Sequence, residues 1–193
     1  MSRYALLLCL LPPAAPLPIA YPLFKQCDSR WGGNAMGTPG AGERSTLCGE
    51  GCAVTSLSMV LNALQVPYPG APVLINPGSL NLWLEGNGGY TCAAGDCNNL
   101  VLNAVERLAP AQVALIGELP PPPFAEIAEG LRNGTVAYIA HVAALHHFVL
   151  LEGVDHGSGG ANFTVRDSFY NATSYALASF SDIIMFRLRQ GAR

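Results

Sequence analysis

The sequence predicts an α+β fold in which N-terminal helices pack on a C-terminal antiparallel sheet. Apolar residues recur at helical spacing in segments up to residue 131, and at strand spacing in segments between residues 135 and 188. Helices followed by strands, without alternation of the two, indicate an antiparallel sheet. With 193 residues, of which 50% are hydrophobic, the chain is long enough for one domain with its own core. We therefore expect a single domain over residues 21–193.

The strongest helix prediction covers residues 52–64. Its apolar residues form one stripe, and glycines before it and prolines after it are end signals. The stripe consists of Ala53, Leu57, Val60, Leu61 and Leu64. Three more helices are predicted: a short one at 80–84, one that begins at an Asp96 N-cap and runs to residue 108, and one at 124–131.

The strand predictions all lie in the C-terminal part of the chain. Residues 135–140 and 147–151 are apolar runs with strand-forming side chains, and residues 163–167 alternate between apolar and polar ones. A Gly-rich turn at 155–160 separates the second strand from the third, and residues 183–188 supply the last strand. These strands complete the predicted sheet.

Composition and charge exclude two classes of protein. Charged residues make up only 12% of the chain and its formal net charge is −3, so no basic surface is available for a nucleic acid. We therefore expect no nucleic-acid partner. A chain with so many hydrophobic residues and so few charges is also not intrinsically disordered.

The first twenty residues have the features of a secretory signal peptide. Arg3 precedes an apolar run, and prolines and small residues follow it up to Ala20. The run is too short to span a membrane. Three N-glycosylation sequons, at Asn133, Asn162 and Asn171, agree with export and predict a glycoprotein. We expect cleavage after Ala20 and a secreted or lumenal protein (extracellular, endomembrane or vacuolar) with no membrane segment after cleavage.

Five cysteines remain after cleavage, an odd number for an oxidising compartment, where pairing is the rule. Cys92 and Cys97 are close enough in sequence to close a short loop, and Cys27 with Cys48 is then the natural second pair. This pairing leaves Cys52 as a free thiol. The alternative is a zinc site of four thiolates, made of Cys48, Cys52, Cys92 and Cys97.

A cysteine, a histidine and an aspartate suggest nucleophilic catalysis. Cys52 stands where a Gly-rich loop becomes the strongest predicted helix, and a helix N-terminus favours the thiolate, the reactive form of cysteine. His147 begins an apolar strand and can act as a general base. Asp167 ends the next strand and can orient the imidazole through its other ring nitrogen.

Four segments resemble the bacteriocin-processing cysteine peptidases, the double-glycine leader peptidases, and above all their stand-alone secreted relatives. The segment Gly51-Cys-Ala-Val-Thr-Ser-Leu-Ser-Met-Val60 is similar to the family's nucleophile helix. Gln26-Cys-Asp-Ser-Arg-Trp31-Gly32 is similar to its Gln-x-Asp-x-x-Trp-Gly segment. His147-Phe-Val-Leu-Leu-Glu-Gly153 and Val165-Arg-Asp167 are similar to the strands that carry its other catalytic residues. Segment 77–90 also resembles the stand-alone members.

The resemblance implies a papain-like fold and a secreted cysteine peptidase that acts on a peptide or protein substrate. Cys52 would be the nucleophile, His147 the general base and then acid, and Asp167 the orienting group. Gln26 would donate to the oxyanion together with the backbone N–H of Cys52. No cofactor or metal is expected, and the protein is expected to be a monomer. Departures from the family pattern are Ala53 after the nucleophile, Ser168 in place of proline, and His146 in place of glycine.

Several alternatives remain open at this point. His146 would be the base if the strand register were shifted by one residue, although neighbouring strand side chains point to opposite faces. Cys48 is the rival nucleophile because Cys-Gly also begins the family's motif. The same scaffold could serve an amidase or an acyl-transfer enzyme, since a fold does not determine the substrate. A catalytically silent binding domain and a disulfide-linked structural module are the non-enzymatic alternatives.

Overall fold

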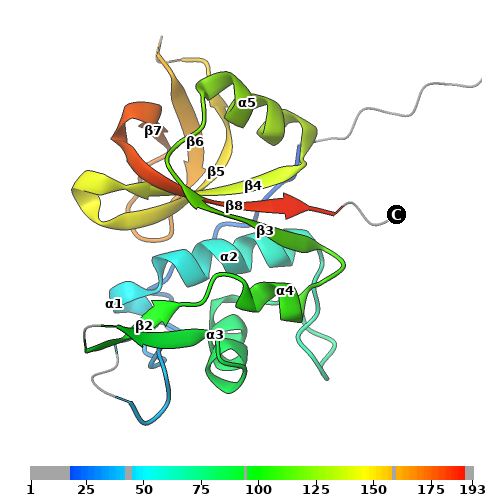
Figure 1. Ribbon diagram of the computed structural model, residues 1–193, viewed down its shortest axis with the longest axis vertical. Helices are drawn as coiled ribbons and strands as arrows, with labels where there is room; N and C mark the ends of the chain where they lie inside the picture. The colour runs from blue at the N-terminus through cyan, green and yellow to red at the C-terminus, as the bar shows by residue number, and fades with distance from the viewer. Residues whose placement is uncertain (1–17, 42–44, 94, 158–159, 190–193) are drawn as a thin grey trace, which may run out of the picture.

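The computed structural model describes residues 18–41, 45–93, 95–157 and 160–189. Its elements confirm an α+β fold (Figure 1). The α-helices are α1 (Leu47–Glu50), α2 (Cys52–Ala63), α3 (Pro77–Gly86), α4 (Ala104–Leu108) and α5 (Phe124–Asn133). The strands are β1 (Tyr90–Ala93), β2 (Asp96–Leu100), β3 (Val113–Leu119), β4 (Val136–Val142), β5 (His147–Asp155), β6 (Asn162–Arg166), β7 (Ser174–Ala176) and β8 (Phe180–Leu188). Two short 3-10 helices are η1 (Ala143–Leu145) and η2 (Leu177–Ser179).

Six strands form one antiparallel sheet in the order β3-β8-β4-β5-β6-β7. Strand β4 lies near its centre, between β5 and β8. β1 and β2 form a separate two-stranded hairpin. The predicted antiparallel sheet after the helices is thus present, with β3 and β7 as further strands.

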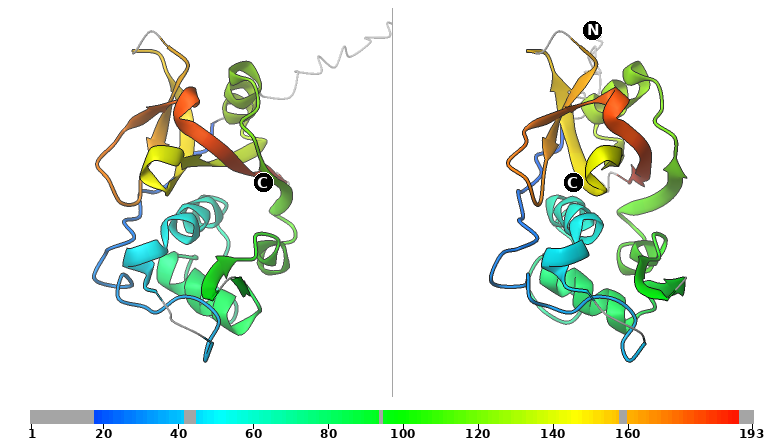
Figure 2. Two further views of the ribbon diagram at one scale, coloured as in Figure 1. Left: turned by 60° about the vertical axis from the view of Figure 1, so that its left-hand side comes forward. Right: turned by 90° about the vertical axis from the view of Figure 1, so that its left-hand side faces the viewer.

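Helices cover both faces of the sheet. α2 lies against one face, and α5 lies against the other (Figures 1 and 2). Successive residues of β4 alternate accordingly: Ile139 belongs to the core under α2, whereas Tyr138 and Ala140 belong to the core under α5. Because both faces are covered, residues 136–140 of β4 and 148–151 of β5 are continuous apolar runs, which is the pattern that predicted these strands.

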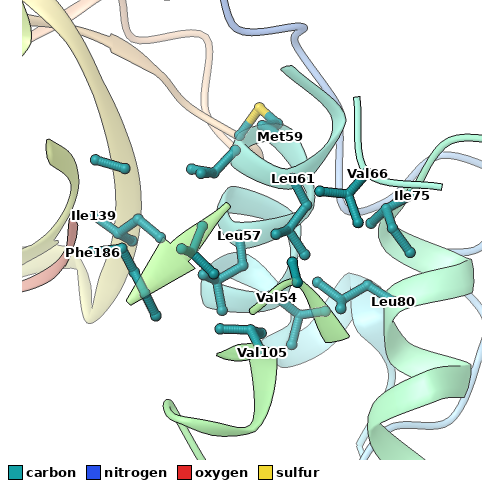
Figure 3. Packing of buried hydrophobic residues seen from close by; sticks show 14 of the residues in the cluster. Val54, Leu57, Met59, Leu61, Val66, Ile75, Leu80, Val105, Ile139 and Phe186 are labelled. Carbon is teal, nitrogen blue, oxygen red and sulfur yellow. The ribbon is translucent and has the colours of Figure 1, made fainter. Parts of the chain in front are cut away.

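Helix α2 is the centre of the larger core. Figure 3 shows Leu57 beside Ile139 and Phe186 of the sheet, whereas Leu61 lies toward Ile75 and Leu80. All six side chains are almost completely buried. Side chains on opposite faces of α2 are buried, one face against the sheet and the other toward α3. This burial fixes the position of α2, and therefore also the position of Cys52, its first residue.

The prediction of a helix from Asp96 to residue 108 is wrong in its first half. Residues Asp96–Leu100 form strand β2, and only Ala104–Leu108 is helical. The Asp96 side chain does accept a hydrogen bond from the Asn98 N–H, as an N-cap would, but the chain then pairs with β1. The disulfide between Cys92 and Cys97 closes the hairpin and holds this segment beside its partner strand.

Both predicted disulfides are confirmed. Cys27 is bonded to Cys48 and Cys92 to Cys97, and Cys52 is the free cysteine of the described residues. The four-thiolate zinc alternative is therefore wrong, because three of its four members are bonded in disulfides.

The predicted signal peptide, residues 1–20, lies mostly outside the described residues. Within the described part of the chain, no helix is long and apolar enough to cross a membrane. Of the sequon asparagines, Asn171 lies in an exposed loop, Asn133 ends α5 and Asn162 begins β6.

Candidate active site

Cys52 opens helix α2 and is partly exposed at its N-terminus. The short helix α1 precedes it, with Gly51 serving both as the C-cap of α1 and as the N-cap of α2. A Cβ atom at Gly51 would lie 2.4 Å from the Leu47 backbone oxygen. Glycine is therefore required at residue 51 by the tight junction between the two helices, and this junction places Cys52 as the first residue of α2.

His147 and Asp167 come from the beginning of β5 and the residue after β6. The His147 Nε2–H donates to Asp167 Oδ1 over 2.9 Å, and both side chains are buried. The Cys52 side chain lies close enough to the His147 ring to contribute to raising its pKa. Because Nε2 is engaged with Asp167, the Nδ1 atom remains for the thiol. The thiol of Cys52 thus lies beside the imidazole, and the imidazole is hydrogen-bonded to the Asp167 carboxylate.

Asp167 is held by its surroundings in the ionised form. Oδ1 also accepts from the backbone N–H groups of Phe169 and Tyr170, and Oδ2 accepts from the Tyr175 hydroxyl over 2.9 Å. Burial alone would raise the pKa of the Asp167 carboxyl, but the hydrogen bonds from His147, Phe169 and Tyr175 outweigh it and lower the pKa. The carboxylate charge therefore persists beside the imidazole.

His147 is stabilised in its protonated form. Burial alone would lower its pKa, but the hydrogen bonds to Asp167 and Cys52 outweigh this effect and raise the pKa to about 9. At neutral pH the ring is therefore an imidazolium, placed between a carboxylate and the thiol. This is the charge state that a thiolate–imidazolium pair requires.

Gln26 is buried next to this triad, and each of its polar groups has a partner. Its Nε2 donates to the Cys48 backbone oxygen over 2.8 Å, and its Oε1 accepts from the Ser168 hydroxyl over 2.9 Å. A carbonyl oxygen can only accept, so the Cys48 contact fixes which end of the amide is the NH₂ group. This contact uses one of the two N–H bonds of Nε2.

These side chains line one cleft, which has a volume of about 420 Å³. Gln26, Cys52 and His147 contribute to its wall, together with Glu50 of α1 and residues of the β1–β2 hairpin. The cleft is lined by the start of α2 and by the β4–β5 connection. Both segments are on the left of Figure 1. The structure thus brings Cys52, His147, Asp167 and Gln26, all four predicted site residues, to one place.

The two rival assignments fit the geometry less well. Cys48 is bonded to Cys27 and has no free thiol. His146 lines the cleft, but its ring lies 6.3 Å from that of His141, and the hydrogen bond to Asp167 belongs to His147. His146 has a backbone φ of 49°, a left-handed conformation that favours glycine, which is the residue of the resembled family at this position.

Three contributions to the site were not expected from the sequence. Tyr175 donates to Asp167, and Ser168 holds Gln26 through its hydroxyl and its backbone oxygen. The Lys25 ammonium donates to the backbone oxygens of Asp167 and Tyr170, at 3.0 and 2.7 Å. The one available signal was that Lys25 is the single lysine of the chain and stands next to Gln26.

The chain matches no family model, and comparisons with curated proteins and with solved structures find no match either. The resemblance to the double-glycine leader peptidases therefore rests on the sequence motifs.

Proposed function

We propose that this protein is a papain-like thiol hydrolase, most simply a secreted cysteine peptidase that cleaves peptide or amide bonds. Cys52 and Gln26 in one cleft with His147, which is hydrogen-bonded to Asp167, carry the proposal. A free thiol at a helix N-terminus, next to a buried imidazolium, is the arrangement in which cysteine acts as a nucleophile. The two disulfides fit an exported protein.

In the first half of the reaction the Cys52 thiolate attacks the substrate carbonyl carbon. The carbonyl oxygen becomes an oxyanion, which the second N–H of Gln26 Nε2 and the backbone N–H of Cys52 would stabilise. The His147 imidazolium then donates its proton to the leaving amine. The C–N bond breaks, and the acyl group remains on sulfur as a thioester.

In the second half the acyl group leaves the enzyme. Neutral His147 accepts a proton from a water molecule, whose oxygen attacks the thioester. The acid product departs, and the thiolate–imidazolium pair is restored. Asp167 stays ionised throughout and keeps the ring in one orientation. An amine in place of water would give acyl transfer, the alternative reaction of the same site.

The proposal is tested by replacing Cys52, the proposed nucleophile. Cys52→Ala should abolish turnover of a peptide library and leave the urea-unfolding midpoint close to that of the wild type, because Cys52 lies partly exposed at a helix end. Iodoacetamide at neutral pH should alkylate Cys52 selectively in the wild type, and His147→Ala should slow this labelling.

The matched control is the disulfide cysteine pair. The double variant Cys92→Ala/Cys97→Ala removes two sulfurs outside the triad and should keep both turnover and labelling. Turnover that survives Cys52→Ala, or a wild-type thiol inert to iodoacetamide, would refute the proposal and favour a binding or structural role.

A further inference from the structure

The cleft exposes an unusual share of the large apolar side chains. In the described part of the chain, eight such side chains are exposed, and three of them line the cleft: Leu145 (38% exposed), Phe169 (48%) and Tyr170 (40%). The others are Leu23, Val73, Leu82, Ile116 and Leu119. Exposed apolar groups gathered at one place mark binding surfaces more often than scattered ones do.

Phe169 and Tyr170 lie beside the His147 imidazole, and Leu145 lines the same cleft. The Tyr170 ring centroid lies 5.4 Å from that of His147, and the Phe169 centroid lies 6.3 Å from it. Leu145 precedes His147 by two residues, at the end of η1. The Phe169 and Tyr170 rings also contact each other edge to face, at 5.0 Å. Together they form an apolar wall on the His147 side of the cleft.

The wall is fixed rather than loose. The backbone N–H groups of Phe169 and Tyr170 donate to Asp167 Oδ1, and the Tyr170 backbone oxygen accepts from Lys25. The carboxylate that orients His147 thus also holds the wall in place. A preformed apolar surface binds a complementary side chain without an ordering cost.

The proposed reaction determines which part of a substrate contacts this apolar wall. His147 protonates the leaving amine, so the amino acid that carries this amine must lie next to the imidazole. We propose that the apolar wall selects substrates with a bulky apolar residue, such as leucine or phenylalanine, directly after the scissile bond. The inference rests on the proposed function, since it assigns a specificity to the leaving-group side of that site.

An acyl-transfer assay tests binding on the leaving-group side of the cleft separately, because only the acceptor amine is varied. The donor is whichever of a small set of acetyl-dipeptide methyl esters the wild type hydrolyses fastest, and the acceptor is leucinamide, phenylalaninamide or glycinamide. The acceptor nitrogen attacks the thioester, the acyl–N bond forms and the acyl–S bond breaks. The nitrogen's proton passes to His147, which restores the imidazolium beside the thiolate. The ratio of transfer to hydrolysis product is measured in one reaction and does not depend on the amount of active enzyme.

Leucinamide and phenylalaninamide should give a transfer ratio about tenfold or more above that of glycinamide, the factor expected from burying one such side chain. Phe169→Ala should remove most of this preference, and Phe169→Leu should restore part of it. Leu82→Ala, which truncates an exposed leucine on α3, should leave the preference unchanged.

Equal transfer ratios for the three acceptors in an active wild type would overturn the inference and leave the proposed function standing. A preference that survives in Phe169→Ala would overturn it as well. A wild type that hydrolyses none of the esters would remove the proposed function, and this inference with it.

Discussion

At the residue scale, the Asp167 carboxylate holds both the His147 ring and the loop that follows Asp167. Its Oδ1 atom binds His147 and the backbone of the following loop, and its Oδ2 atom binds Tyr175. One carboxylate therefore sets the orientation of the His147 ring and the shape of the cleft wall beside it. Its charge also favours the imidazolium over the neutral ring, which links the position of this residue to the pH dependence of the site.

The first prediction concerns this pH dependence. The pKa of His147 is raised to about 9, so the imidazolium is present at neutral pH and is lost as the pH rises through 9. Wild-type kcat/KM should therefore fall on the alkaline side near pH 9. Asp167→Asn removes the negative charge, lowers the His147 pKa and should move this alkaline limb to lower pH. It should also reduce kcat/KM roughly ten- to hundredfold, because the ring loses charge stabilisation but keeps a partner.

Tyr175→Phe is the matched variant for this experiment. It removes one hydrogen bond to the carboxylate and leaves its charge in place, so the alkaline limb should stay close to that of the wild type. If kcat/KM of Asp167→Asn falls at the same alkaline pH as that of the wild type, a group other than His147 determines this fall.

The second prediction concerns the oxyanion. Gln26→Ala removes the second N–H of Nε2, which acts mainly in the transition state, so kcat should fall about 10²–10³-fold with little change in KM. Gln112→Ala removes a glutamine outside the cleft and is the control. A rise in KM at unchanged kcat would assign Gln26 to substrate binding instead.

The grouping of the four candidate site residues was predictable, but the residues that hold them in place were not. Cys52, His147, Asp167 and Gln26 stand in recognisable segments next to regular elements. The contacts of Ser168 and Tyr175 depend on how residues 168–175 fold back over the site, and no periodicity describes that loop. The Lys25 ammonium donates to backbone oxygens of residues far along the chain. Every residue has a backbone oxygen, so a contact of this kind leaves no pattern in the sequence.

At the scale of elements, the junction of α1 and α2 determines the position of Cys52, the proposed nucleophile. Thr46 caps α1 by accepting from the Gly49 N–H, and Gly51 then joins α1 directly to α2. The chain passes so close to Leu47 that a side chain at residue 51 does not fit. The glycine thus positions Cys52 without contacting a substrate.

The third prediction tests this junction. Gly51→Ala places a methyl group 2.4 Å from the Leu47 backbone oxygen, so either α1 or the start of α2 must shift. We expect a loss of stability of about 1–3 kcal/mol. Turnover should fall roughly 10²-fold, because a displacement of about 1 Å has that effect on catalysis.

Gly86→Ala is the matched control, since a Cβ at this helical glycine meets nothing within 4 Å. It should raise stability by about 0.5–1 kcal/mol and leave turnover unchanged, because alanine is the better helix former. Urea unfolding and steady-state kinetics measure both effects. Normal turnover in Gly51→Ala would show that the junction does not position the thiol.

The elements differ in how well their sequence pattern identifies them. Residues 52–64 combine a clear apolar stripe with end signals, and the helix forms there. Residues 96–100 carry an N-cap signal, but a disulfide and a partner strand override it. Strand β3 was not predicted, because its pairing partner β8 lies far along the chain and a bulge between Leu115 and Gly117 interrupts its register.

At the scale of the whole molecule, residues 18–28 connect the sheet with the helical part. The Gln26 N–H donates to the Ser168 backbone oxygen at the sheet, and Cys27 is bonded to Cys48 of α1. The Cys48 backbone oxygen in turn accepts from Gln26 Nε2. The site therefore lies where the sheet and the helical part meet, and the Cys27–Cys48 disulfide lies next to it.

The fourth prediction compares the two disulfides. Cys27–Cys48 joins residues 21 apart and Cys92–Cys97 joins residues only 5 apart. Loop-closure entropy then gives stabilisations of about 3 and about 2 kcal/mol. Replacing both cysteines of a pair by alanine should lower the free energy of unfolding in that order. Only the loss of Cys27–Cys48 should also lower kcat, because it loosens the carbonyl that orients Gln26. Urea unfolding and kinetics on one substrate test both parts, and equal effects of the two double variants on kcat would contradict the proposed coupling.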